Sequence, residues 1–309
     1  MKLVSYRQGN ETKLGAVGGG KVIDLAAAAR RFTGATGQEV PQAAFSTMDD
    51  LLTASAGALE TAGGISAWAL ENAEETILDL ETAEFAVPLA SPGKIVCIGL
   101  NYADHCRETD TPIPEFPVVF TKFTTAMLPH GGEISWRPKT TQAVDYEAEL
   151  AVIIGKKASN IPEDEAMGYV AGYTTANDVS ARDAQSADGQ WVRGKSFDTF
   201  CPIGPFVITA DALPDPHTLD IRCRVNGMTV QDSNTRELIF KIPYLIAYIS
   251  QAITLMPGDI ILTGTPYGTG YFRDPQILLK PGDTVEVEIE GSGILVNEVV
   301  RYSGSQVVT

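Results

Sequence analysis

Short apolar stretches rich in β-branched and aromatic residues predict strands over most of the chain after residue 90. Each stretch is bounded by glycine, proline or aspartate. The predicted strands cover residues 94–100, 116–123, 149–155, 168–177, 204–209, 221–227, 259–265, 283–291 and 293–302. Pro-Gly-Asp sequences at 257–259 and 281–283 predict tight reversals between neighbouring strands. This pattern favours a closed or rolled β architecture over βαβ repeats.

The first 90 residues show a mixed pattern. Residues 2–7 and 21–25 predict a β-hairpin around the Gly18-Gly19-Gly20 turn, and Asp24 can cap a helix that follows it. Alanine-rich segments with few β-branched residues predict two further helices, at 46–56 and 64–73. We therefore expect a small α+β layer at this end of the chain.

A change of composition at residues 88–92 predicts a domain boundary. Residues 1–90 would form a small N-terminal domain, and residues 91–309 a mainly β domain. Bulky apolar residues recur at intervals of three and four over 242–255, which predicts a helix. The β-branched residues in this segment are also compatible with a strand. The predicted fold class is α+β, predominantly β.

Composition and charge narrow the possible partners. The chain has 309 residues, 44% apolar and 20% charged, as in ordinary globular proteins. Its net charge of −16 disfavours nucleic acid and anionic membrane surfaces. No run approaches the ~20 apolar residues of a membrane span, and the first residues lack the apolar core of a secretory signal. The four cysteines form no C-x-x-C pair and favour a reducing compartment, so we expect a cytoplasmic protein.

Residues 189–196 match the nucleotide-binding pattern G-x-x-x-x-G-K-[ST] letter for letter. A functional P-loop needs a buried strand before it and a helix after it. Polar residues precede this segment, and Pro202, Gly204 and Pro205 follow it and disfavour a helix. We interpret the match as a coincidence.

Three carboxylates are candidates for a metal site. Glu147 and Glu149 project from one face of a predicted strand, roughly 7 Å apart, and Asp178 follows the strand at 168–177. The two glutamates alone are also typical of an exposed acidic edge, and Asp178 could simply cap a helix. Together the three indicate a hard cation, Mg²⁺ or Mn²⁺, rather than zinc. A helical turn after Asp178 would place Arg182 and Gln185 on its own face.

A second group of polar residues follows the predicted strand at 94–100. In one helical turn His105 and Glu108 are adjacent, an arrangement in which the carboxylate orients the imidazole and raises its basicity. Such a pair would act as a general base. The alternative is a histidine that only caps or hydrogen-bonds within a partly buried region.

Together these segments resemble the fumarylacetoacetate hydrolase family, especially its short-chain, acylpyruvase-like members. The resemblance spans roughly residues 94–302, and the residues before 88 look like the variable N-terminal domain of the family. It rests on the ordered blocks GLNYADHCRE, PVVFTKFTTA, DYEAELAVIIGKKA, GYTTANDVSARDAQ, RGKSFDTFCPIGPF, VNG and GDIILTGTPYGTG. The fold it implies is a mixed β-roll or β-sandwich catalytic domain with the site at its open mouth.

The resemblance also implies roles for individual residues. The ligands of a divalent ion, usually Mg²⁺ with Mn²⁺ or Ca²⁺ as substitutes, would be Glu147, Glu149 and Asp178. The catalytic residues would be His105, Glu108 and Lys195. The substrate-binding residues would be Arg182, Gln185, Lys122 and Thr265. Lys195 belongs to the false P-loop, so that segment would contain a catalytic residue all the same.

The function implied is metal-dependent hydrolysis of a carbon–carbon bond in a 2,4-diketo acid, of acylpyruvate or fumarylpyruvate type. His105 and Glu108 would activate water, and Lys195 would stabilise an enolate on the pyruvate half. The same enolate leaves two alternatives open: oxaloacetate-type decarboxylation, and hydration or isomerisation of an unsaturated 2-oxo dicarboxylic acid in aromatic catabolism. The competing interpretation is a non-catalytic metal- or ligand-binding module, which would need neither a general base nor an oxyanion donor. The expected partners are a small 2-oxo acid and a second copy of the chain in a homodimer.

Overall fold

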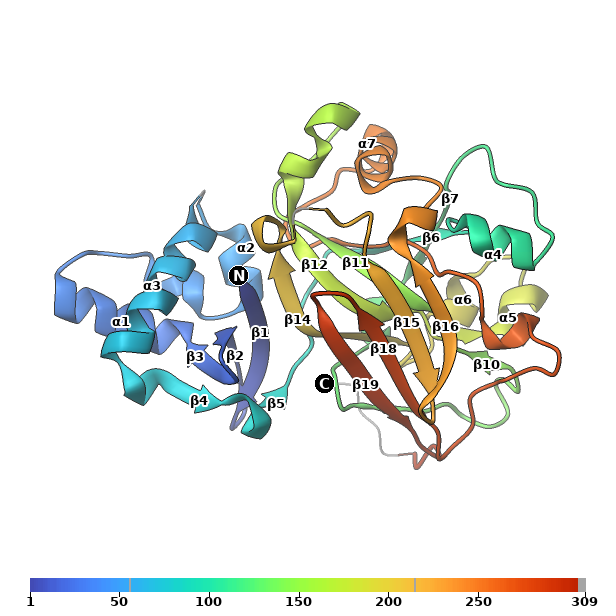
Figure 1. Ribbon diagram of the computed structural model, residues 1–309, viewed down its shortest axis with the longest axis horizontal. Coiled ribbons are helices and arrows are strands. Elements are labelled where there is room, and N and C mark those ends of the chain that lie inside the picture. Colours follow the sequence, from blue (N-terminus) through green and yellow to red (C-terminus); the bar gives the residue numbers. More distant parts are fainter. Residues whose placement is uncertain (56, 214, 305–309) are drawn as a thin grey trace.

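A mixed twelve-stranded sheet runs through the molecule (Figure 1). The computed structural model describes residues 1–55, 57–213 and 215–304. The main path of the sheet has the order β4-β3-β2-β1-β14-β12-β11-β17-β6-β7, while β5 pairs with β1 and β8 with β14. These strands are β4 Ile77–Asp79, β3 Lys21–Asp24, β2 Glu11–Gly18, β1 Lys2–Gln8, β14 Cys201–Thr209, β12 Val170–Asn177, β11 Ala148–Ile154, β17 Ile260–Leu262, β6 Ile95–Gly99, β7 Val118–Lys122, β5 Glu84–Phe85 and β8 Met127–Leu128.

A five-stranded sheet packs across β11, β12 and β14, and its strands lie in front of them in Figure 1. In order, its strands are β16 Met228–Asn234, β15 Asp220–Val225, β18 Thr284–Ile289, β19 Gly293–Val299 and β9 Glu133–Ile134. The short strands β10, Val144–Asp145, and β13, Ser180–Ala181, pair beside it. Alternate side chains of both large sheets, among them Leu150, Val152 and Val287, meet in one apolar core. The predicted α+β, mainly β, class is confirmed.

The helices lie around these sheets, and the first and third of them pack on β2 and β3. They are α1 Leu25–Thr36, α2 Met48–Thr53, α3 Ala58–Asn72, α4 Ala103–Glu108, α5 Arg182–Ala187, α6 Val192–Lys195 and α7 Ile242–Ala252. The short 3₁₀ helices are η1 Gln42–Phe45, η2 Glu74–Thr76, η3 Leu80–Thr82, η4 Thr124–Ala126, η5 Glu163–Tyr169, η6 Ala210–Ala212, η7 Thr235–Glu237 and η8 Gly270–Phe272. Asp24 caps α1 as predicted, because its side chain accepts from Ala27 N at 2.9 Å. The helix predicted at 242–255 is also confirmed, as α7.

The hairpin predicted between residues 2–7 and 21–25 is wrong. The strand β2 lies between β1 and β3 and pairs with both of them. Its glycines weaken the strand pattern, yet Gly15 sits in a tight contact, since a Cβ there would lie 2.4 Å from Cγ1 of Val22. Gly15, which close packing requires, therefore weakens the sequence pattern by which β2 would have been predicted.

The N-terminal strands continue the sheet of the larger region. Lys2, Leu3 and Val4 of β1 pair with the end of β14, and the apolar core beneath contains residues from both sides of position 90. The division into domains at 1–90 and 91–309 stays a prediction. In the described ranges, no helix combines the length and the apolar character needed to cross a membrane.

Candidate active site

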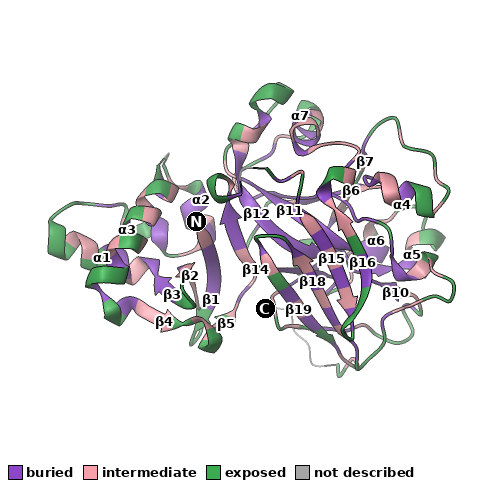
Figure 2. Cartoon of the chain, in the orientation of Figure 1, coloured by how far each residue is buried: buried purple, intermediate pink, exposed green. Residues whose placement is uncertain are grey.

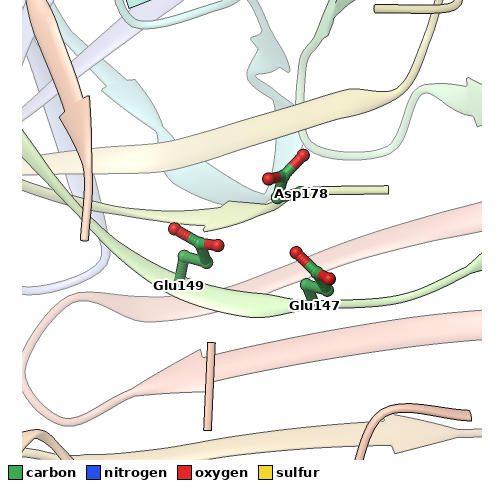
Figure 3. A group of neighbouring side chains, drawn as sticks. All are labelled: Glu147, Glu149 and Asp178. Atoms are coloured by element: carbon green, nitrogen blue, oxygen red, sulfur yellow. The ribbon is translucent and has the colours of Figure 1, made fainter. Parts of the chain in front are cut away.

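The candidate site lies where β11 begins and β12 ends, at two neighbouring strands in the interior of the sheet order. The two strands are antiparallel, and Glu149 pairs with Ala176. This register brings Glu147, just before β11, beside Asp178, just after β12, and Asp178 N donates to Glu147 O at 2.9 Å. One carboxylate oxygen from each of Glu147, Glu149 and Asp178 lies within 4.8 Å of the others, and Figure 3 shows the three groups converging. All three residues are buried, which excludes an exposed acidic edge.

Two buried lysines neutralise part of this cluster. Lys195 Nζ lies 2.5 Å from Glu147 Oε2 and 2.9 Å from Asp178 Oδ2. Lys122 Nζ lies 2.5 Å from the other oxygen of Asp178 and donates to Val179 O at 3.2 Å. Asp178 is therefore held from both sides by ammonium groups. It does not cap a helix, because the short strand β13 follows it and α5 begins only at Arg182.

Glu149 has no such partner. Within the described ranges it forms no salt bridge, and its Oε2 accepts only from Gly264 N, at 2.7 Å. Burial, together with the nearby charges of Asp178 and Glu147, raises the pKa of Glu149 well above its usual range. Burial also acts to raise the pKa of Glu147, but Lys195 and Arg182 outweigh it and hold that pKa at about 2.

The donor set fits a hard divalent cation. Three buried carboxylates are the oxygen ligands that Mg²⁺ and Mn²⁺ prefer, and one of them, Glu149, forms no salt bridge with any described residue. Glu147, Glu149 and Asp178 are the residues that could hold such an ion. Their role as ligands stays a prediction.

Arg182, the first residue of α5, links the cluster to a fourth acid. Its Nε and Nη2 lie 2.9 and 2.8 Å from Asp145 Oδ2, and Nη2 is also 2.7 Å from Glu147 Oε1. The remaining nitrogen, Nη1, donates to Gln185 Oε1 at 3.2 Å. Arg182 thus fixes Glu147 and leaves the amide nitrogen of Gln185 as a donor for a ligand. Asp145 also accepts from Gly270 N, at 2.7 Å, and the sequence reasoning had missed it.

His105 and Glu108 lie on α4, as the helical spacing predicted. His105 Nδ1 is 3.2 Å from Glu108 Oε2, and the other oxygen of Glu108 accepts from Gly268 N at 2.9 Å. The carboxylate favours the tautomer that carries its proton on Nδ1, so Nε2 remains available as a base. The ring of Phe272 stands edge-on to the imidazole, with centroids 5.7 Å apart.

Thr265 is oriented by a residue that the sequence reasoning did not single out. Its Oγ1 accepts from Gln231 Nε2 at 2.9 Å, and Gln231 is itself fixed because its Oε1 accepts from Ala148 N at 2.9 Å. Since the hydroxyl oxygen of Thr265 already accepts, its proton is free to be donated to a ligand. Gln231 lies in β16, whose sequence MTVQDSN is mostly polar, so no local pattern distinguishes this buried glutamine from its exposed polar neighbours.

These side chains enclose a cavity of about 100 Å³. Its lining residues include seven of the predicted site residues: His105, Glu147, Glu149, Arg182, Gln185, Lys195 and Thr265. Lys122, Asp178 and Glu108 are not among the described residues that line it, and each instead contacts a residue of the cluster or of α4. The unpredicted part of the wall includes Gly99, Phe120, Trp191 and Phe272.

The segment 189–196 has no P-loop architecture. The helix α5 precedes it, in place of a strand, and the strand β14 follows the short helix α6. The strand before it and the helix after it that a P-loop requires are therefore absent around this segment, in agreement with the interpretation of the match as a coincidence. Two of its residues nevertheless belong to the cavity wall, Trp191 and Lys195.

Comparison with known proteins gives consistent matches. Residues 94–300 match the family model described as fumarylacetoacetate (FAA) hydrolase C-terminal. A Rattus norvegicus protein named oxaloacetate tautomerase Fahd2a, mitochondrial, is 48% identical over 242 residues, which are 78% of this chain and 77% of the rat protein. The expected cytoplasmic location of this chain and its homodimeric state stay predictions.

Two solved structures share almost the whole fold. Maleylpyruvate hydrolase from Sphingobium sp. SYK-6, in complex with manganese(II) ion and pyruvate, is 31% identical with a TM-score of 0.75, covering 97% of this chain and 99% of that chain. The 5-carboxymethyl-2-hydroxymuconate delta-isomerase from Mycobacterium smegmatis is 31% identical with a TM-score of 0.74, covering 98% and 100%. The similar proteins thus include a tautomerase, a hydrolase and an isomerase.

Proposed function

The chain belongs to the fumarylacetoacetate hydrolase family, and from this premise we propose that it is a divalent-metal-dependent keto–enol tautomerase of a small 2-oxo dicarboxylic acid, oxaloacetate being the substrate we favour. The observation that supports catalysis is that a histidine–carboxylate pair adjoins the same small cavity as the buried carboxylates. The choice of reaction is supported by the 48% identical rat tautomerase. The comparisons favour isomerisation or oxaloacetate chemistry over carbon–carbon hydrolysis, which the family resemblance alone had put first.

Binding of the substrate is assigned to the polar wall of the cavity. When bound by Glu147, Glu149 and Asp178, a divalent cation supplies Lewis-acid polarisation of a 2-oxo group and so acidifies the neighbouring C–H bonds. Gln185 Nε2 and the Thr265 hydroxyl are donors placed to hold a carboxylate. A net charge of −16 is therefore compatible with an anionic substrate, because a bound cation would make the local electrostatic potential at the site more positive.

The proton transfer is assigned to His105. Its Nε2 takes a proton from C3 of the keto form, the C3–H electron pair becomes the C2–C3 double bond, and the C2 oxygen gains the negative charge. The ammonium group of Lys195 stabilises that charge. The imidazolium then gives the proton to the C2 oxygen and completes the enol, so that one C–H bond has been exchanged for one O–H bond. Glu108 stabilises the imidazolium through Nδ1.

The test is to supply metal-stripped protein with Mg²⁺ or Mn²⁺ and follow three rates. With oxaloacetate these are the exchange of its C3 hydrogens for deuterium and the release of pyruvate. With acetylpyruvate the rate is the loss of diketone absorbance. We expect metal-dependent exchange that is much faster than the other two. Pyruvate release at the rate of exchange would identify a decarboxylase. Faster loss of the diketone would restore the hydrolase interpretation, and full exchange after chelation would remove the metal from the proposal.

A further inference from the structure

We propose that Trp191 sets the upper limit on substrate length and restricts the cavity to 2-oxo acids with chains of about four carbons. The inference rests on the proposed function for the kind of ligand, and on the geometry of one wall for its size. Trp191 lies just before α6, within the segment 189–196 that resembles a P-loop. Its role in the cavity gives that segment a purpose other than phosphate binding.

The indole of Trp191 packs directly against bare backbone. Gly99 ends β6, and a Cβ at this position would lie 2.2 Å from Cζ3 and 2.8 Å from Cη2 of the Trp191 ring. Both contacts are closer than real Cβ atoms come to other atoms. Any larger residue at position 99 must therefore displace the indole, so the position of this wall depends on the pair of Gly99 and Trp191.

Phe120 connects Trp191 to the carboxylate cluster through Lys195. Lys195, which contacts Glu147 and Asp178, has its Nζ 5.3 Å from the centroid of the Phe120 ring. The Phe120 and Trp191 rings in turn are 5.2 Å apart at an angle of 68°. A 2-oxo acid anchored at the carboxylates would meet this aromatic pair with the remainder of its chain.

The volume of the cavity leaves little room for a longer chain. Its 100 Å³ compares with roughly 300–1,000 Å³ for sites that take drug-sized ligands. A short acid fits such a space, whereas each added methylene would have to displace the indole or a neighbouring side chain.

The experiment measures binding and does not depend on turnover. Pyruvate, 2-oxobutyrate and 2-oxohexanoate are titrated calorimetrically into Mn²⁺-loaded wild type, Trp191→Ala and Trp191→Phe. In the wild type we expect 2-oxohexanoate to bind at least ~10-fold more weakly than 2-oxobutyrate, in line with the usual cost of methylenes that do not fit a pocket. Trp191→Ala should remove most of that difference, and Trp191→Phe part of it. Trp68→Ala, which removes an indole of α3 that packs on Phe32 of α1, is the matched control and should leave the ratio unchanged.

A second pair of variants tests the contact itself. Gly99→Ala should weaken binding of all three acids by driving the indole into the cavity, and adding Trp191→Ala to it should restore binding of the short acids. This rescue requires a direct contact, and a general loss of structure would not produce it. The proposal is overturned if wild type binds 2-oxohexanoate as tightly as 2-oxobutyrate, or if neither Trp191 variant changes the ratio.

Failure of the size limit can be told apart from failure of the proposed function. Wild type that binds the short acids selectively but does not exchange the C3 hydrogens of oxaloacetate would retain the size limit and lose the tautomerase assignment. Exchange of oxaloacetate with no effect of Trp191 on chain length would do the reverse. If no 2-oxo acid binds to the Mn²⁺-loaded protein, both fail.

Discussion

At the ends of β11 and β12 the chain buries its ion pairs, whereas the Lys21–Asp79 and Arg31–Glu75 pairs around α1 and β3 stay in contact with water. The side chains of Lys122 and Asp178 are both 0% exposed, and Lys195 is 2% exposed. By contrast, Lys21 and Asp79 are 49% and 62% exposed, and the Arg31–Glu75 pair is similarly open. Figure 2 shows the same contrast, with exposed faces on α1 and α3 and buried strands at the centre of the larger region.

The difference shows what each region uses charge for. Removing charges from water costs more than most ion pairs return, so buried pairs are weak evidence for stability by themselves. The N-terminal region is held by apolar packing of residues such as Leu25, Ala29 and Phe45, and the two exposed ion pairs lie outside that core. The candidate site accepts the cost of burying charge, because buried charges keep a fixed geometry and act strongly on a ligand.

The largest effect is expected for Lys195→Met. The change removes the cation that contacts both Glu147 and Asp178 and leaves two buried carboxylates facing each other. Breaking a buried pair in this way costs about 3–5 kcal/mol, and we expect turnover to fall by more than ~10⁴-fold. Urea unfolding and C3 hydrogen exchange measure the two effects. Lys21→Met is the matched control on an exposed pair, and the contrast between the regions is broken if both variants unfold at the same urea concentration.

The next effect concerns the proposed base. His105→Ala should lower the exchange rate by ~10²–10⁴-fold while the protein still binds pyruvate, because the general base is lost and the carboxylates and Lys195 remain. His217→Ala is the matched control, since His217 also lies beside a carboxylate, 3.6 Å from Asp215, but does not line the cavity. Steady-state exchange and pyruvate titrations on both variants check this. An equal loss of rate in the two would assign the proton transfer to another residue.

The sequence predicted the parts of the site that depend on residues close together in the chain, and it missed those that depend on distant residues. Glu147 and Glu149 could be placed on one strand face by local alternation, and His105 beside Glu108 by helical spacing. Asp145 contacts Arg182 from 37 positions away, and Gln231 reaches Thr265 across 34. No periodicity records such pairs, so they emerged only from the folded chain.

The same limit explains the errors in the fold. The strands of the larger region were predicted because their continuous apolar runs are buried on both faces, as in β11 and β12. The strand β2 was missed because Gly15 and Gly18 interrupt its pattern, although Gly15 is required by its contact with Val22. The role of Gly99 was hidden in the same way, since only the position of Trp191 shows why a side chain cannot stand there.

A smaller effect on stability is expected for Glu149→Gln, and it should appear only when the metal is present. In metal-free protein the raised pKa already favours the uncharged form of Glu149, and glutamine can keep the bond from Gly264 N, so stability should not fall. In wild type, Mg²⁺ at 100 times its dissociation constant should add about 2.7 kcal/mol, and the variant should lose most of this gain. Thermal unfolding with and without Mg²⁺ tests both halves, with Glu60→Gln on α3 as control. A variant that keeps the full Mg²⁺ stabilisation would show that Glu149 is not a ligand.

The smallest effect is expected for the exposed ion pair between Arg31 and Glu75. Arg31→Ala removes the pair with Glu75 on the surface of α1, where both side chains are more than half exposed and solvent screens their attraction. The urea midpoint should stay within the scatter of repeat titrations, at both 0.1 M and 1 M salt, and the exchange rate of oxaloacetate should not change. The double variant Arg31→Ala, Glu75→Ala completes a cycle that isolates the pair from the loss of either side chain. A salt-dependent coupling well outside that scatter would mean that the N-terminal region also relies on ion pairs, and the contrast with the buried cluster at β11 and β12 would then be one of degree.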